Sequence, residues 1–294
     1  DILFNLIKQM QIQTSSKGFS SKNICLAGGV SLNSVFAGKI LENFEGVFEN
    51  IFIPPVPYDA GLSIGACQYH WHSVLGNPRD EDTFVSPYLG EDYLDEDIEN
   101  ALSNNTEKLI IKRDISIDQC VDLIVDNNII SIFQGRSESG RRALGNRSIL
   151  ASPISTEMKD LINKKVKHRQ WYRPFAPSIL EDCGDEWFEG FFPSPYMSFV
   201  FKFKEDKLGK APAVEHFNKS ARLQSVSKSQ NKEYYNIIDS FYKKTDVPIL
   251  LNTSFNDREP IVETPEDAVK CFLSTDIDFL YFVKQNILVS KATA

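Results

Sequence analysis

No apolar run in this 294-residue sequence reaches the roughly 18 residues that a membrane-spanning helix requires. The first residues also lack the charged-then-apolar pattern of a signal peptide. The five cysteines are odd in number, lie far apart and include no Cys-x-x-Cys pair, which argues against a disulfide framework. We therefore expect free thiols and a soluble, cytoplasmic protein without a membrane helix.

Three common ligand-binding signatures are also missing. The sequence has no Gly-x-x-x-x-Gly-Lys-Ser/Thr loop, no Gly-x-Gly-x-x-Gly fingerprint and no Gly-x-Ser-x-Gly elbow. Its formal net charge of −8 argues against a general nucleic-acid binder. A nucleotide bound by this protein would need a binding loop of another kind. The negative net charge favours a small phosphorylated ligand over a nucleic-acid duplex.

The charge is unevenly distributed along the chain. Residues 80–126 hold fourteen acidic and three basic residues, whereas residues 136–173 hold ten basic and three acidic ones. The segment 135–148, GRSESGRRALGNRS, follows an apolar strand-like run and contains four arginines and three glycines. Arginine binds phosphate or carboxylate bidentately, and glycine lets the backbone approach a ligand. We therefore predict an oxyanion site; the alternative is a solvated basic surface or structural ion pairs.

The apolar pattern predicts an α/β fold in two parts. In the first part we expect helices at 2–11, 33–41 and 62–74, and strands at 23–27 and 47–53. In the second we expect helices at 98–102, 117–127, 156–166, 231–244 and 265–273, and strands at 108–113, 129–133, 196–204, 248–251, 279–283 and 287–289. Thr264 is the expected N-cap of the last helix. The domains predicted are 1–76, an acidic linker at 77–104, and 105–294.

Other polar residues lie at positions where α/β folds present ligand contacts. Asn252, Thr253 and Ser254 directly follow the expected strand 248–251, although a simple turn would also explain them. Asp59 lies in a proline-bounded loop before a helix, where it serves either as an N-cap or as a carboxylate that reaches a metal ion. Arg222 is a lone arginine that the pattern alone does not assign to a site.

Seven segments, in chain order, carry a recognisable pattern: LAGGVSLN at 26–33, PYDAG at 57–61, GRSESGRRALGNRS at 135–148, RPFAPS at 173–178, SPYMSFV at 194–200, ARLQ at 221–224 and LLNTSFN at 250–256. The pattern resembles the O-carbamoyltransferases of the nodulation-protein NodU and cephamycin-biosynthesis type. The resemblance implies the end of an actin/Hsp70-like domain, followed by a YrdC-like domain with a twisted mixed sheet. It also implies that the second domain makes carbamoyl-adenylate from ATP and carbamoyl phosphate, and that the first transfers the carbamoyl group to a hydroxyl.

Residue roles follow from the resemblance by position. It implies catalytic roles for Arg142, Lys167 and Arg173, and substrate or ATP contacts from Arg136, Glu138, Arg147, Ser148, Asn163, Arg169, Arg222, Asn252, Thr253 and Ser254. In the first domain it implies an adenosine loop with Gly28, Gly29 and Asn33. It also implies Asp59 as an Fe²⁺ ligand, together with two histidines of an HxxxH motif. Arg141 departs from the family, which commonly has proline there, and the turn at 256–260 is one residue shorter than usual.

The resulting hypothesis is an ATP-dependent O-carbamoyltransferase, with Mg²⁺ accompanying ATP and a sugar or natural product as acceptor. Because no HxxxH occurs in the sequence and Asp1 falls within an expected helix, we expect a fragment whose transfer half-reaction is lost. Two alternatives stay open: an enzyme that carbamoylates a nucleoside in tRNA, and a non-catalytic sensor of a phosphorylated metabolite. A homodimer is compatible with the sequence, and the acceptor cannot be identified from it.

Overall fold

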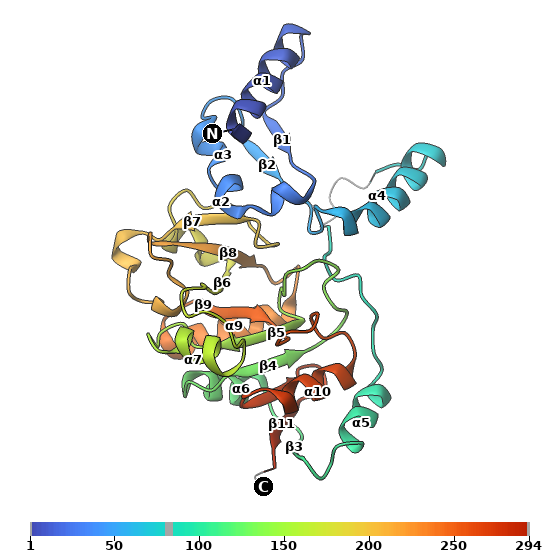
Figure 1. Ribbon diagram of the computed structural model, residues 1–294, viewed down its shortest axis with the longest axis vertical. Helices are drawn as coiled ribbons and strands as arrows, with labels where there is room; N and C mark the ends of the chain where they lie inside the picture. Colours follow the sequence, from blue (N-terminus) through green and yellow to red (C-terminus); the bar gives the residue numbers. More distant parts are fainter. Residues whose placement is uncertain (1, 80–84, 293–294) are drawn as a thin grey trace. The chain divides into compact units, whose positions relative to one another are not determined.

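The computed structural model describes residues 2–79 and 85–292, and it divides the chain into two compact units (Figure 1). One unit comprises Asp1–Val85 with Ser198–Val200, and the other comprises Ser86–Met197 with Phe201–Ala294. Residues 80–84 of the expected acidic linker lie outside the described residues. None of the described helices has the length and apolar character needed to cross a membrane.

The first unit is a small α/β arrangement. Helix α1 (Ile2–Ser16) is followed by β1 (Asn23–Cys25), α2 (Ser34–Ala37), α3 (Ile40–Asn43), β2 (Asn50–Phe52) and α4 (Leu62–Tyr69). Strands β1 and β2 pair in parallel, and Ile7, Ile24, Ile40 and Phe48 form the buried core. The helix expected at 33–41 is instead two short helices, which part at Gly38 and Lys39, since glycine is a weak helix former. The helix expected at 62–74 ends in a π-helical turn, His70–Val74.

A mixed nine-stranded sheet, in the order β3-β11-β10-β4-β5-β9-β6-β8-β7, makes up most of the second unit; only Phe199 and Val200 of β7 are assigned to the first unit. The strands are β3 (Leu109–Lys112), β4 (Ile130–Phe133), β5 (Arg147–Ala151), β6 (Ala176–Leu180), β7 (Phe199–Lys202), β8 (Ser220–Val226), β9 (Ile249–Ser254), β10 (Phe279–Phe282) and β11 (Ile287–Lys291). Most neighbours pair antiparallel, while β4 with β10 and β6 with β8 pair in parallel. The expectation of an α/β fold with a mixed sheet is confirmed.

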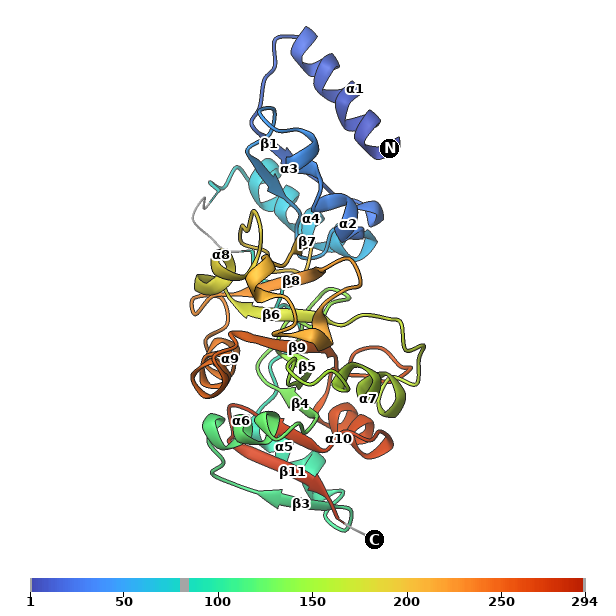
Figure 2. The same ribbon diagram turned by 90° about the vertical axis from the view of Figure 1, so that its left-hand side faces the viewer.

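The helices of this unit are α5 (Asp95–Ser103), α6 (Ile117–Val125), α7 (Met158–Lys165), α8 (Gly184–Trp187), α9 (Lys232–Thr245) and α10 (Pro265–Ser274). Helix α6 packs beside α9, and α5 packs beside α10 (Figures 1 and 2). Because α5 buries Ile98, Ala101 and Leu102, this part of the range expected as a linker belongs to the compact second unit. Thr264 caps α10 and forms a capping box with Asp267, which confirms the expected start of that helix.

Three central strands, β5, β6 and β8, were not expected from the sequence. Strands β5 and β6 are buried at every position, so they show no alternation of polar and apolar residues. Strand β8 contains Arg222 and Gln224, and β6 contains Pro177, residues that reduce the apparent strand character. The predicted strand 196–204 is shorter than expected and is limited to β7. These strands bring distant polar segments into one site.

Candidate anion-binding site

The loop 134–146, which joins β4 to β5, is built around a buried carboxylate. Glu138 is 9% exposed, and its Oε1 accepts the backbone N–H groups of Leu144 at 2.7 Å, Asn146 at 2.8 Å and Arg147 at 3.4 Å. Burial raises the pKa of this carboxyl above its ordinary value, while the backbone donors lower it. The sequence predicted a ligand contact for Glu138; the structure places its side chain beneath the loop, where it shapes the backbone.

Arg147 is likewise a structural residue in this arrangement. Its guanidinium lies 3.6 Å from the ring centre of Phe133 and donates to the carbonyls of Gln134 at 2.7 Å and Gly135 at 3.1 Å. These acceptors belong to the start of the same loop, so Arg147 closes it. Ser148, also in β5, accepts the Gly145 N–H through its Oγ at 3.0 Å. Neither Arg147 nor Ser148 lines the pocket described next.

A cavity of about 110 Å³ is lined by the end of β9, the start of β6 and Arg222 of β8, together with residues 141–143 of this loop. It collects residues from segments that are far apart in the sequence, and we call it the anion pocket; its lining residues are Arg141, Arg142, Ala143, Arg169, Pro174, Phe175, Ala176, Met197, Arg222, Asn252, Thr253 and Ser254. Six of the predicted site residues meet here, namely Arg142, Arg169, Arg222, Asn252, Thr253 and Ser254. Arg141 was noted only as a departure from the family, yet it also lines the pocket.

Three arginines of the pocket lack an ion-pair partner among the described residues. Within residues 2–79 and 85–292, none of Arg142, Arg169 and Arg222 forms an ion pair with a carboxylate. Burial, with repulsion from Arg142 and Arg169, lowers the pKa of Arg222 to about 9. The Nε of Arg222 is buried and has no hydrogen-bond partner in the described chain. An anion in the pocket would therefore relieve both the repulsion and the missing hydrogen bond.

The pKa values of Arg169 and Arg142 are also lowered. Burial, with repulsion from Arg173, lowers the pKa of Arg169 to about 10. Burial and the charge of Arg141 lower the pKa of Arg142. Asn163 is buried and accepts the Arg169 Nε–H at 2.7 Å, while its amide donates to the Arg173 carbonyl at 3.1 Å. Asn163 thus positions the segment that carries Arg169, and the exposed Arg173 contributes its charge from outside the pocket lining.

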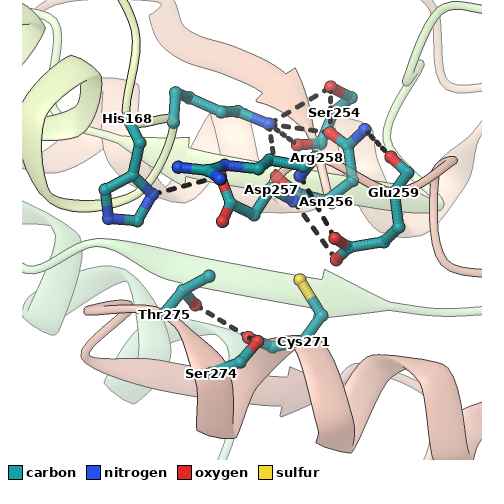
Figure 3. A network of polar contacts seen from close by, with 10 residues as sticks. His168, Ser254, Asn256, Asp257, Arg258, Glu259, Cys271, Ser274 and Thr275 are labelled. Carbon is teal, nitrogen blue, oxygen red and sulfur yellow. Dashed lines mark hydrogen bonds and ion pairs between the residues drawn. The ribbon is translucent and has the colours of Figure 1, made fainter.

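Lys167 fixes the end of strand β9. Its ammonium is almost fully buried and donates to the carbonyl and Oγ of Ser254, at 2.5 and 3.3 Å, and to the carbonyl and Oδ1 of Asn256, at 2.7 and 2.8 Å. Figure 3 shows these acceptors beside the turn in which Glu259 accepts the N–H groups of Asp257 and Arg258. Burial, with repulsion from Arg169, lowers the pKa of Lys167 to about 7. Lys167 therefore contacts the pocket through Ser254.

The remaining predicted residues lie elsewhere. Arg136 is exposed, donates to the Gly90 carbonyl at 2.6 Å and lines a different cavity of about 280 Å³. In the first unit, Asn33 caps α2 by accepting the Phe36 N–H at 3.1 Å, and Gly28 has a positive φ of 90° at the preceding turn. Asp59 begins a 3₁₀ turn, Asp59–Gly61. No group of three or more metal-ligating side chains was found in the part of the chain that the structure describes.

Two sequence profiles match the chain. Residues 5–68 match the profile described as the carbamoyltransferase N-terminus, and residues 121–291 match the one described as the carbamoyltransferase C-terminus. The chain therefore belongs to the carbamoyltransferase family.

Named relatives fall in the same family. Nodulation protein NolO of Bradyrhizobium diazoefficiens is 43% identical over 90% of this chain and 49% of its own length. Nodulation protein NolNO of Sinorhizobium fredii is 43% identical over 93% of this chain and 40% of its own length. Nodulation protein U of Sinorhizobium fredii is 34% identical over 80% of this chain and 40% of its own length. The chain thus spans about half the length of the curated relatives that it matches.

Proposed function

We propose that the anion pocket binds ATP and carbamoyl phosphate and forms carbamoyl-adenylate for an O-carbamoyltransferase reaction. The observation that supports this most directly is the unpaired Nε of Arg222, which lies beside Arg142 and Arg169 without a neutralising carboxylate in the described chain. Three partly buried guanidinium groups can bind several phosphate oxygens bidentately. A ligand with one charge would leave part of this repulsion in place.

The neutral side of the pocket suits a carbamoyl group. Asn252 is 1% exposed and donates through Nδ2 to the Ala143 carbonyl, Ser178 Oγ and Gln224 Oε1, at 3.0 to 3.2 Å. Its Oδ1 has no donor in the described chain. A carbamoyl NH₂ can supply one, whereas a phosphate cannot. The cavity of about 110 Å³ is smaller than a typical cofactor pocket of roughly 300 Å³ or more, so it fits the reacting groups and leaves the nucleoside outside.

The proposed reaction has three steps. Hydrolysis of carbamoyl phosphate releases phosphate and leaves carbamate. A carbamate oxygen then bonds to the α-phosphorus of ATP while the bond to pyrophosphate breaks. In the transfer step, an acceptor hydroxyl attacks the carbamoyl carbon, AMP leaves, and the hydroxyl proton is lost to solvent. The arginines stabilise the charge that develops on the phosphate oxygens, so these steps need no nucleophilic side chain.

The sequence predicted two metal ions, Mg²⁺ with ATP and Fe²⁺ at Asp59, and the described residues suit the first better than the second. The pocket lining contains no carboxylate, so a Mg²⁺ ion would be held by the phosphates and water. Asp59 lacks companion ligands among the described residues, so we assign no step to Fe²⁺ in this chain. The acceptor, proposed to be a hydroxyl of a sugar or natural product, and a homodimer remain predictions.

Carbamoyl-phosphate-dependent exchange of labelled pyrophosphate into ATP tests the proposal. We expect exchange with the wild-type chain and its loss in Arg222→Ala. A matched control is Arg113→Ala, because the exposed Arg113 pairs with Glu99 in another part of the unit. Equal rates in wild type and Arg222→Ala would refute the assignment of the site. Pyrophosphate binding that requires Arg222 but gives no exchange would favour the sensor alternative.

A further inference from the structure

The first residues of the second unit run along the arginine-rich loop. Tyr88 forms an isolated antiparallel bridge with Glu138. Ser139 donates both its backbone N–H, at 2.8 Å, and its Oγ–H, at 2.9 Å, to the Pro87 carbonyl. We call residues 86–90 the strap. The backbone of the strap is thus paired with Glu138 and Ser139, which precede Arg141 and Arg142 in the loop.

The far end of the strap approaches the loop too closely for any side chain. The Gly90 N–H donates to the Ser137 carbonyl at 3.1 Å. A Cβ built on Gly90 would overlap the Oγ of Ser137, and Ser137 is itself held by the carboxylate of Glu263 at 2.5 Å. Alanine at position 90 would therefore push the strap and the loop apart. The close approach requires glycine here for space, not for an unusual φ.

The hydroxyl of Tyr88 connects the strap to the pocket. It donates to the Leu144 carbonyl at 2.9 Å and accepts from the Asn231 amide at 3.0 Å. The same Leu144 carbonyl accepts from Gln224 Nε2 at 2.9 Å, and Gln224 Oε1 accepts from the pocket residue Asn252 at 3.0 Å. A chain of hydrogen bonds thus runs from the strap through Leu144 to the pocket.

Leu144 also follows Arg142 by two residues, and Ala143 between them lines the pocket. The hydrogen-bonded amides at 144–146 follow Arg142 in the chain, so the backbone of the loop sets the position from which the Arg142 side chain extends. The loop in turn is held by the Glu138 carboxylate, which accepts the Leu144 N–H, and by the strap, whose Pro87 carbonyl accepts the Ser139 hydroxyl. The orientation of Arg142 therefore depends on contacts that the strap makes.

We infer that the strap is a positioning element of the anion pocket, in which Tyr88 and Gly90 hold the loop so that Arg142 faces the bound anion. The inference rests on the proposed function of that pocket. Tyr88 and Gly90 are positioning residues, since neither of them lines the anion pocket.

Calorimetric titration of the 294-residue chain with pyrophosphate tests the inference. Tyr88→Phe removes only the hydroxyl and its two hydrogen bonds, and we expect about tenfold weaker binding. Gly90→Ala should weaken binding by at least as much. The matched control is Tyr235→Phe, whose hydroxyl lies 3.4 Å from Asp182 on an exposed part of α9, and it should leave the Kd unchanged. Unchanged binding in both strap variants would overturn the inference.

A double-mutant cycle separates positioning from general destabilisation. If the strap acts through Arg142, Tyr88→Phe will add little to the loss of affinity in Arg142→Ala, yet will add fully to the loss in Arg169→Ala. Full additivity in the Arg142→Ala background would overturn the inference. Failure of the proposed function would look different, because carbamoyl-phosphate-dependent pyrophosphate exchange would then be absent while the strap variants would still weaken pyrophosphate binding.

Hydrogen exchange supplies a readout that needs no ligand. The backbone N–H groups of Leu144 and Asn146 donate to the Glu138 carboxylate in the intact loop. Their hydrogens should exchange with solvent faster in Tyr88→Phe than in Tyr235→Phe. Equal exchange at these two amides in both variants would overturn the inference, whatever the pocket binds.

Discussion

Replacing Arg222 with methionine should stabilise the unliganded protein while it abolishes anion binding. The pKa of Arg222 is lowered from the ordinary value of an arginine to about 9, chiefly by burial. At about 1.4 kcal/mol per pKa unit, this difference corresponds to roughly 5 kcal/mol of electrostatic cost to the folded state. That figure is an upper limit, because the effective dielectric of protein sites reduces such costs. We expect a net gain of about 2 kcal/mol in the free energy of unfolding, since methionine also fills the space of the lost side chain.

The pH dependence of this gain has a definite sign. Arg222 has a lower pKa in the folded chain than in the unfolded chain, so its protonated form disfavours folding. The cost is fully present below about pH 9 and declines as the pH rises from about 9 toward the ordinary pKa of an arginine. The stability difference between wild type and Arg222→Met should therefore be constant from about pH 6 to 8 and shrink above about pH 9.

Urea denaturation at pH 7, with and without pyrophosphate, measures both effects. Without the anion, Arg222→Met should unfold at the higher urea concentration. With pyrophosphate at 100 times its Kd, wild type should gain about 2.7 kcal/mol and the variant nothing. Arg113→Met is the control and should match wild type in both conditions, because Arg113 is exposed outside the pocket. A variant that is less stable than wild type without the anion, and a wild type that pyrophosphate does not stabilise, would refute the reasoning.

Three further predictions concern the scaffold of the site. The ammonium of Lys167 holds the end of β9 and has a pKa of about 7, so the rate of pyrophosphate exchange should decline as the pH rises from about 7 to 8 and this ammonium loses its proton. In Lys167→Arg the side chain stays protonated, so the pH–rate profile should lose this decline. The same decline in the variant would contradict the prediction. Glu138→Ala should lower the free energy of unfolding by about 3 kcal/mol, and Glu138→Gln by much less, because the amide oxygen can still accept the loop N–H groups. Equal losses in the two variants, measured by urea denaturation, would refute that role. Thr264→Ala should cost about 1 kcal/mol in thermal unfolding through loss of the α10 cap, whereas no change in Tm would show that the cap is dispensable.

Local sequence signals predicted several elements well. Thr264 and Pro265 marked the start of α10, where the cap and the following helix involve only neighbouring residues. The run at 129–133 corresponds to β4, and the two runs at 279–289 correspond to the antiparallel pair β10 and β11. These elements have clear boundaries because turn and capping residues flank their apolar positions.

The central strands could not be predicted in the same way. Strand β5 begins with Arg147 and Ser148, which look exposed in the sequence but are fully buried. Arg147 is tolerated there because its donors reach carbonyls at positions 134 and 135, and its plane lies over Phe133. These contacts form because β5 pairs with β4, and the residues around β5 in the sequence do not indicate this pairing.

The sequence by itself determined the family motifs, the α/β class and the concentration of arginine in one region. Only the tertiary structure decided which arginines face a common pocket. Arg142, Arg169 and Arg222 converge on it, while Arg147 closes the loop and Arg136 lines another cavity. The physical reason is that backbone carbonyls occupy the donors of Arg147, whereas Arg222 is left with a buried Nε–H that no acceptor among the described residues satisfies.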